Sequence, residues 1–201
     1  MATRGRTARQ RIASLRFPLR GRRVELVPPA ESHLREIVRL LSEPSVARWT
    51  LHVPRPYRMR NAREFLRNST RQRRAGRSLV LMVVRRRDGA LLGGVGLHHL
   101  EERGDSAEAG WWIGKEHRGF GYSTEAVDLL VRTGFRRLAL HRVQAFVFAR
   151  NRASRAVARR CGFRYEGRLR DEARKGRRWV TTLLYARLAS DPPAVQGARR
   201  R

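Results

Sequence analysis

The stretch Gly110–Val127, GWWIGKEHRGFGYSTEAV, has the pattern of a strand, a turn with two glycines and the start of a helix. The first amide groups of a helix have no partner within it and carry partial positive charge, so a helix N-terminus can bind phosphate. Arg118 adds a forked cation, while Gly119 and Gly121 permit positive φ and a close approach to the main chain. Because the spacing is neither that of a P-loop nor that of a Rossmann fingerprint, we predict a phosphate site of another kind, with an ordinary connecting turn as the alternative.

On both sides of this stretch, segments with the hydrophobic pattern of a strand alternate along the chain with segments that have the 3.6-residue period of a helix. Strands are predicted at 22–28, 78–84, 90–100, 107–114, 142–149, 164–170 and 177–188. Helices are predicted at 30–43, 61–76, 122–138 and 152–163. The three strands in the middle follow one another through short turns and are expected to be antiparallel. The order therefore indicates one domain with a mixed α/β sheet.

The domain is expected to span residues 21–189, with disordered basic tails at 1–20 and 190–201. No apolar run is long enough to cross a bilayer, and the first residues lack the apolar core of a secretory signal, so we expect a cytoplasmic protein without membrane contact. The arginine-rich start also fits an organellar transit peptide, which stays a minor alternative.

The chain carries 46 lysines and arginines against 17 acidic residues, a formal charge of +29. Such a charge attracts nucleic acid and other polyanions. The arginines are nevertheless spread along the chain without interleaved aromatic residues, which favours a generally solvated basic surface over a dedicated nucleic-acid interface.

Cysteine and histidine offer little chemistry. Cys161 is the only cysteine, and we expect it to lie buried on one face of a helix with Ala153, Ala156 and Val157 rather than to act as a nucleophile. The pair at 98–99 would point to opposite faces of a strand, so no metal site is predicted.

The segment RGFGYS, residues 118–123, resembles the Arg/Gln-x-x-Gly-x-Gly/Ala signature of the GNAT superfamily of acyl-coenzyme A dependent N-acetyltransferases. Ser123 departs from the usual Gly or Ala. Further on, the chain is similar to the Rim-type ribosomal-protein alanine N-acetyltransferases, with an Asn-x-x-Ser helix start, a Gly-Phe-x-x-Glu-Gly hinge and a final Tyr-Ala-Arg strand. The resemblance covers about residues 21–188 and is strongest from Glu108 onward.

The resemblance implies an α/β (α+β) fold with a mixed, mostly antiparallel sheet, flanked by about four helices. Its fourth and fifth strands, here 107–113 and 143–149, would splay apart to admit acetyl-CoA as cosubstrate, with no metal. The family pattern assigns the cofactor-binding role to Trp112, Ile113, Arg118, Gly119, Phe120, Gly121, Tyr122, Ser123, Asn151 and Ser154.

The same resemblance suggests catalytic residues. Glu166 is the favoured general base and Glu108 its competitor, while Ser154 is the candidate acid for the leaving thiolate and a main-chain N–H of the Trp112–Ile113 segment would bind the oxyanion. Each carboxylate could instead be a surface group paired with arginine. Asn151 is equally well explained as a helix N-cap, with Ser154 in the first turn.

The expected reaction is acetyl transfer to a primary amine, foremost the N-terminal amine of a protein. A small amine such as an antibiotic or polyamine is the alternative, since acceptor choice would rest on the variable segments 49–57 and 170–178. A basic RNA- or ribosome-binding protein without catalysis is the alternative of another class. RNA contact through the arginine-rich surface is compatible with both classes, and the protein is expected to be a monomer or a homodimer.

Overall fold

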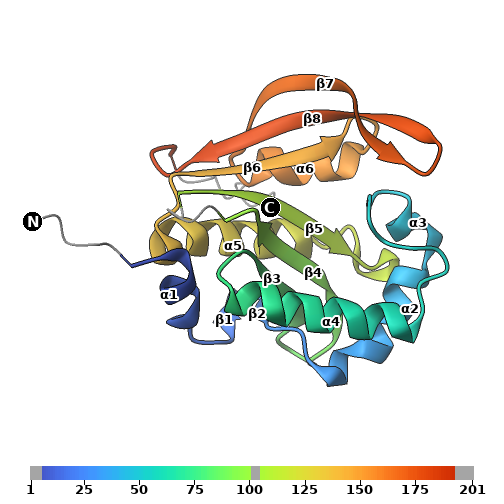
Figure 1. The fold of residues 1–201 in the computed structure, drawn as a ribbon, viewed down its shortest axis with the longest axis horizontal. Helices are drawn as coiled ribbons and strands as arrows, with labels where there is room; N and C mark the ends of the chain where they lie inside the picture. The colour runs from blue at the N-terminus through green and yellow to red at the C-terminus, as the bar shows by residue number, and fades with distance from the viewer. Residues whose placement is uncertain (1–5, 101–104, 193–201) are drawn as a thin grey trace, which may run out of the picture.

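The computed structural model describes residues 6–100 and 105–192, which form a single sheet with helices on both faces (Figure 1). The strands are β1 Leu19–Arg20, β2 Val24–Val27, β3 Leu79–Arg85, β4 Leu91–His98, β5 Ser106–Ile113, β6 Arg142–Phe148, β7 Arg164–Lys175 and β8 Arg178–Leu188. The helices are α1 Ala8–Ala13, α2 Leu34–Ser42, α3 Pro44–Ala47, α4 Met59–Arg74, α5 Tyr122–Leu138 and α6 Arg152–Arg160, with 3₁₀ turns η1 Glu31–His33 and η2 Lys115–His117. Among the described residues, no helix combines the length and apolar character needed to span a membrane.

The sheet has eight strands in the order β1-β2-β3-β4-β5-β6-β8-β7. Only β5 and β6 run parallel, and the other neighbours are antiparallel. The mixed, mostly antiparallel sheet predicted from the sequence is thus confirmed.

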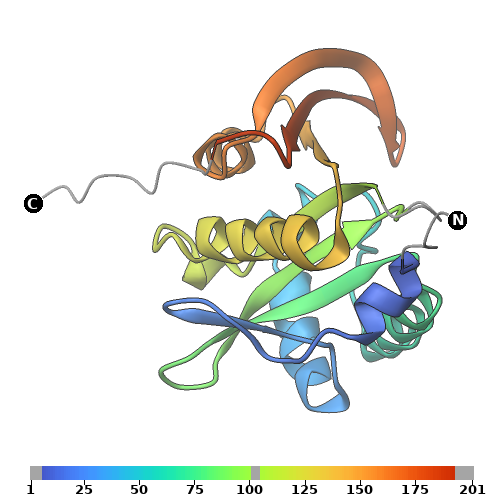
Figure 2. The same cartoon turned by 90° about the vertical axis from the view of Figure 1, so that its left-hand side faces the viewer.

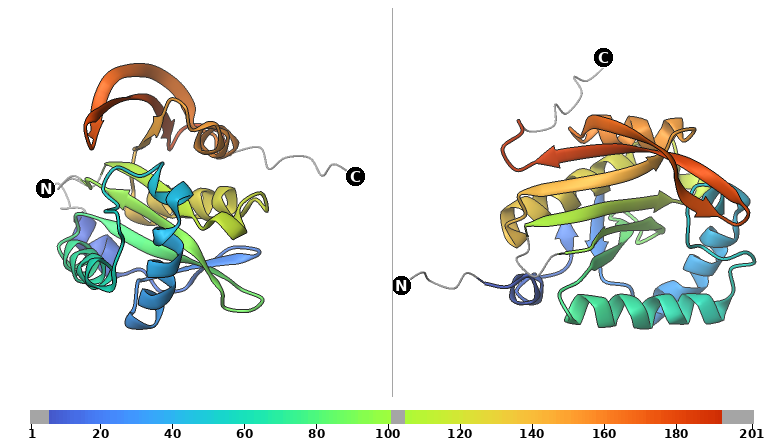
Figure 3. Two further views of the ribbon diagram at one scale, coloured as in Figure 1. Left: turned by 90° about the vertical axis from the view of Figure 1, so that its right-hand side faces the viewer. Right: turned by 45° about the horizontal axis from the view of Figure 1, so that its top comes forward.

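Strands β5 and β6 separate soon after they meet. Their pairing runs only from Ser106 opposite Arg142 to Glu108 opposite Gln144, and the two strands then diverge (Figure 3). From Ala109 onward β5 pairs with β4 alone, so the edge of β5 that faces β6 is left without a strand partner. This opening is the splay expected from the sequence.

Two hydrophobic layers hold the sheet, and Figure 2 shows from the side the helices that cover its two faces. On one face α5 packs Val127, Leu130 and Val131 against the sheet, because these apolar residues recur every three or four positions. On the other face α2 and α4 pack against residues such as Met82 and Leu91. The sheet is therefore covered on both faces along β2 to β5, and α5 is held with its N-terminus at the opening.

A long hairpin, β7–β8, arches beyond β6 (Figure 1). Two irregularities of register, at Tyr165/Gly167 and Leu169/Ala173, bend it. At its far end Lys175 donates from Nζ to the carbonyl oxygens of Ala47 (2.7 Å) and Thr50. The hairpin thereby contacts the end of α3 and the segment that follows it.

The expected disordered tail at 1–20 is wrong for residues 6–20, which form α1 and β1. Thr7 caps α1 with a reciprocal side-chain bond to Gln10. Ile12 is buried at 4% exposure in the main core, and Arg11 donates to the Leu138 carbonyl oxygen at 2.8 Å. Contacts with distant residues therefore order residues 6–20, although the polar composition of this segment predicted disorder. Residues 1–5 and 193–201 of the expected tails lie outside the described residues.

The expected apolar face of α6 also needs correction. Ala153 is exposed, whereas Ala158 is fully buried, as is Cys161. Burial raises the pKa of the Cys161 thiol to about 12, which confirms a packing role for this residue.

Candidate active site

The turn before α5 has the backbone of an anion cradle. Gly119 and Gly121 adopt φ of 84° and 78°, the left-handed region that other residues rarely occupy. An added Cβ at Gly119 would meet nothing within 4 Å, so the space above it is open. Within the part of the chain that the structure describes, the amide groups from Gly119 to Thr124 have no hydrogen-bond partner. Several free N–H groups at a helix N-terminus form a phosphate site.

Arg118 is fixed beside this turn by neutral groups. Its Nε donates to the Ile113 carbonyl oxygen at 3.1 Å and its Nη1 donates to Ser45 Oγ at 3.0 Å. No acidic partner of Arg118 occurs among the ion pairs of the described residues, so its charge is available to an anion. Ser45, at the start of α3, was not anticipated from the sequence.

Arg23, which precedes β2, is a second cation at the turn that sequence reasoning missed. It donates from Nη1 to the Phe120 carbonyl oxygen (2.9 Å) and from Nε to Glu125 in the first turn of α5 (2.9 Å). Its guanidinium also lies 5.1 Å from the centre of the Tyr122 ring. The contacts span about a hundred residues of sequence, so only the fold brings Arg23 to the turn.

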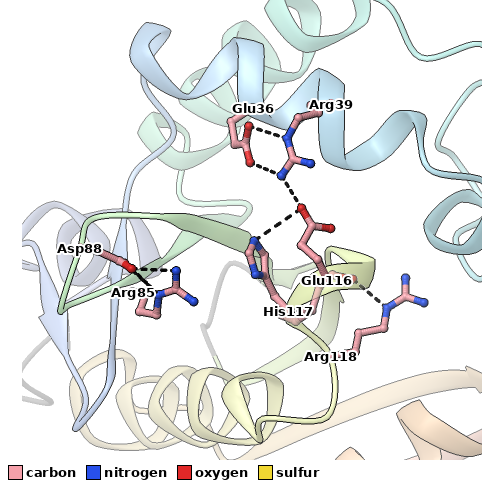
Figure 4. Close-up of polar contacts among 8 residues, drawn as sticks. Glu36, Arg39, Arg85, Asp88, Glu116, His117 and Arg118 are labelled. Atoms are coloured by element: carbon pink, nitrogen blue, oxygen red, sulfur yellow. Dashed lines mark hydrogen bonds and ion pairs between the residues drawn. The ribbon is translucent and has the colours of Figure 1, made fainter.

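An ion-pair network fixes the 3₁₀ turn η2 ahead of Arg118 (Figure 4). Arg39 of α2 binds Glu36 through two nitrogens and also binds Glu116, while His117 lies 3.8 Å from Glu116. The potential ligand atoms of Glu36, Glu116 and His117 lie within 4.8 Å of one another. Because Arg39 already binds both carboxylates, we interpret the cluster as a brace between α2 and η2.

A cavity of about 1280 Å³ opens between the diverging strands. Its floor is formed by β4 and β5, and its walls are formed by β6, α4 and the segment 49–57. Two aromatic residues of the lining, Trp49 and Phe148, pack against each other, with ring centroids 6.4 Å apart and ring planes inclined by 60°. Four predicted site residues line this one cavity: Glu108, Trp112, Asn151 and Ser154.

Asn151 and Ser154 meet at the start of α6. Asn151 Oδ1 accepts from the Ser154 amide (3.1 Å) and Asn151 Nδ2 donates to Ser154 Oγ (2.9 Å). Asn151 is therefore an N-cap, as one of the two sequence interpretations held. The same contact turns Ser154 Oγ toward the cavity wall with its own proton still free to donate, so the capping role and a chemical role are compatible.

The preference for Glu166 as the base is not supported by the geometry. Glu166 lies on β7 outside the cavity, and Arg142 binds both of its oxygens at 2.6 and 3.0 Å. The bond to Arg142 lowers the pKa of Glu166, which makes it a weaker base. The register of β7 against β8 shifts between Tyr165 and Gly167, at Glu166 itself, a feature that sequence periodicity does not reveal.

Glu108 has the properties of a base instead. It lies at the last pair shared by β5 and β6, and its side chain is 33% exposed. Burial raises the pKa of Glu108, and Glu172 raises it further while His99 and His52 oppose the change. A carboxylate with a raised pKa at the mouth of a cavity can accept a proton and release it to water.

The opening also fits an extended acyl carrier with amide groups. The β5 edge from Ala109 to Ile113 has no strand partner, and main-chain groups on such an edge pair with any extended ligand. The indole N–H of Trp111 is buried and unpartnered among the described residues. The turn at Gly119–Thr124 would hold the pyrophosphate of coenzyme A, and the strand edge would hold its pantetheine arm.

A mixed sheet parted between two parallel strands, with an anion turn at the opening, is the acetyltransferase fold that the sequence resemblance implied. The chain belongs to the acetyltransferase (GNAT) domain family, whose sequence profile matches residues 23–164.

Among relatives, YdaF of Bacillus subtilis, named provisionally as a ribosomal N-acetyltransferase, is 43% identical over 84 residues, which are 42% of this chain and 46% of YdaF. The chain thus spans about half the length of the curated relatives it matches. RimJ of Mycobacterium smegmatis, solved with a coenzyme A disulfide, superposes with a TM-score of 0.75 at 25% identity over 83% of this chain and 82% of RimJ. Spermidine N-acetyltransferase of Vibrio cholerae, solved with coenzyme A and spermine, superposes with a TM-score of 0.73 at 22% identity. The superposition covers 84% of this chain and 97% of the spermidine N-acetyltransferase.

Proposed function

We propose that this protein transfers the acetyl group of acetyl-CoA to a primary amine, and that the acceptor is the N-terminal amine of a protein. One observation supports this most directly: a single cavity in the parted sheet holds Glu108 and Ser154 and adjoins a free strand edge that leads to the anion turn. The relative YdaF, named as a ribosomal N-acetyltransferase, favours a ribosomal-protein acceptor.

In this proposal the bound thioester supplies the activated acetyl group, and the residues of the chain supply positioning and proton transfer. Glu108 accepts a proton from the acceptor ammonium, which frees the nitrogen lone pair for attack on the acetyl carbon. A main-chain N–H of the Trp112–Ile113 segment stabilises the oxyanion. As the C–N bond forms and the C–S bond breaks, Ser154 donates its proton to the leaving sulfur. The attacking nitrogen then loses its surplus proton through water to the Ser154 oxygen, which leaves the amide, the free thiol and a regenerated serine.

Peptides with alanine or serine at the N-terminus, together with spermidine and an aminoglycoside, are incubated with acetyl-CoA and followed by mass spectrometry. We expect a gain of one acetyl group on the α-amine of peptides and little on the small amines. Preferred acetylation of spermidine would support the small-amine alternative. Two observations favour that alternative: the acidic residues Glu64 and Glu108 line the cavity, and a spermidine acetyltransferase is among the structural neighbours. If no amine is acetylated and coenzyme A does not bind, the proposal is wrong.

A stripe of arginines on α4 motivates the second candidate, a protein that binds RNA without catalysis. The stripe is formed by Arg60, Arg63, Arg67, Arg71 and Arg74. All five are exposed, and their spacing of three or four places them on one face over about 21 Å of helix. None takes part in an ion pair among the described residues.

Changing Arg63, Arg67 and Arg71 together to glutamine is expected to weaken binding to ribosomal RNA at 50 mM salt by about tenfold or more, because each phosphate contact releases a counterion. Fluorescence anisotropy at several salt concentrations measures the loss. The matched control replaces Arg152, Arg159 and Arg160 of α6, which removes the same charge from another surface. Equal losses in both variants would mean that net charge alone attracts RNA, and RNA binding without coenzyme A binding would favour the second candidate.

A further inference from the structure

His98 lies on the cavity floor, and the proposed proton transfers do not use it. It is the last residue of β4 and lies opposite Glu108 of β5 in the antiparallel register. Residues directly opposite in an antiparallel pair project from the same face of a sheet. Both side chains line the same cavity.

A pair of glycines makes room for the His98 ring. Gly96 and Gly110 lie opposite each other on β4 and β5. A Cβ at Gly96 would come 2.6 Å from His98 Nε2, and a Cβ at Gly110 would come 3.6 Å from the same atom. The ring therefore extends from position 98 over Gly96 and Gly110, toward the unpaired part of β5. Any other residue at position 96 would displace it.

The ring nitrogens of His98 are unoccupied by the protein. No hydrogen bond of the described residues uses either nitrogen, and neither belongs to the fully buried unpartnered atoms. They face the space of the cavity. Burial lowers the pKa of His98, and the neighbouring His99 lowers it further, so at neutral pH the ring is uncharged and one nitrogen is a hydrogen-bond acceptor.

We propose that His98 is a catalytic residue that accepts a hydrogen bond from the acceptor amine and, with Glu108, fixes its orientation. This inference rests on the proposed acetyl transfer. A primary amine that has lost one proton keeps two N–H groups and one lone pair. With one N–H on Glu108 and the other on the His98 ring, the lone pair is directed toward the free edge of β5, where the thioester carbonyl would lie. Imidazole acts only in its neutral form, because the imidazolium ion has no acceptor and repels an ammonium group.

Other ionisable groups surround this arrangement and influence its pH dependence. Those that line the cavity are His52 before α4, Glu64, Arg67 and Arg71 of α4, and His99 after β4, and Glu172 of β7 acts on Glu108. Burial moves the pKa of Glu108 up and that of His98 down, so the two titrations approach each other. Activity should therefore require both Glu108 and His98 to be unprotonated, and both groups should lose their protons over the same range of acidic pH.

The test compares His98→Leu and His98→Gln with the wild-type protein on a peptide with N-terminal alanine. We expect kcat/KM for the peptide to fall about ten- to hundredfold in His98→Leu, with the KM of acetyl-CoA unchanged. Glutamine keeps an acceptor oxygen and should restore part of the loss, but it does not titrate. The acid side of the plot of log kcat/KM against pH should accordingly be one unit less steep in His98→Gln than in the wild type. His141→Leu, an exposed histidine outside the cavity, is the matched control and should change neither quantity.

A second measurement does not depend on turnover. The pKa of the His98 ring, followed by NMR, should fall when the alanine peptide is added together with coenzyme A, because a nearby ammonium group disfavours the imidazolium ion. Coenzyme A carries no acetyl group, so no turnover takes place during the titration. An unchanged slope in His98→Gln and an unshifted ring titration would overturn the role of His98 even if the wild type acetylates peptides. Absence of acetylation by the wild type would instead count against the proposed function, and the ring titration would still decide whether His98 contacts an amine.

Discussion

Replacing Glu108 with glutamine is expected to lower kcat for an N-terminal peptide by about a hundredfold or more, the usual contribution of a general base. Glutamine has nearly the same shape but cannot accept the amine proton. The dissociation constant of coenzyme A should stay the same, because Glu108 lies at the mouth of the cavity and far along β5 from the anion turn. Steady-state kinetics and calorimetry with coenzyme A measure the two quantities.

Glu166→Gln is the matched control for Glu108→Gln. Glu166 binds Arg142 at the surface, so its loss removes an exposed ion pair, which contributes at most about 1 kcal/mol to stability, and should leave kcat within about twofold. A large loss of kcat in Glu166→Gln with normal activity in Glu108→Gln would restore the assignment that the sequence favoured.

The pH dependence of the wild type gives an independent check on Glu108. A base must be unprotonated, so activity is lost as the pH falls through its pKa. Burial raises that pKa, and the acid limb should therefore lie at a higher pH than for an ordinary glutamate. In Glu108→Gln this component of the limb should disappear.

Gly119→Glu should weaken the binding of coenzyme A by about a hundredfold. The side chain has open space, since a Cβ at Gly119 meets nothing within 4 Å, so the fold itself is not obstructed. It places a carboxylate where the pyrophosphate would lie, and two like charges a few ångströms apart at the surface repel by about 3 kcal/mol, or about a hundredfold in Kd. Calorimetric titration with coenzyme A measures the change.

Gly89→Glu separates the charge effect from backbone strain. Gly89, in the turn between β3 and β4, has φ of 71° and likewise nothing within 4 Å of an added Cβ. Both substitutions therefore force a side chain into the left-handed region with similar strain. If Gly89→Glu weakens coenzyme A binding as much as Gly119→Glu does, or if neither does, the turn is not the phosphate site.

The sequence was sufficient for features that depend on local pattern. The short apolar runs of β3 and β4, which are buried on both faces, and the 3.6-residue period of α5, which buries one face, predicted these elements. The glycines at 119 and 121 predicted a left-handed turn, which the structure confirms. Local chemistry alone requires glycine there.

Features that depend on distant contacts could not be predicted in this way. The six residues of α1 have a weak pattern, and only the packing of Ile12 into the core gives them a place. Arg23 reaches the anion turn because β2 lies beside α5, which no residue near Arg23 indicates. Glu166 likewise binds Arg142 and lies outside the cavity lining, at a register shift of β7 that no local pattern indicates.

The parted strands have a further consequence for the protein before it meets its ligand. The free edges of β5 and β6 expose unpaired main-chain groups, and such edges can pair with a second molecule and start aggregation. A ligand that occupies the opening would cover these edges and also favour the native state by mass action. Coenzyme A bound in the opening would then raise the fraction of the protein that stays native and would keep the two edges from pairing with a second molecule.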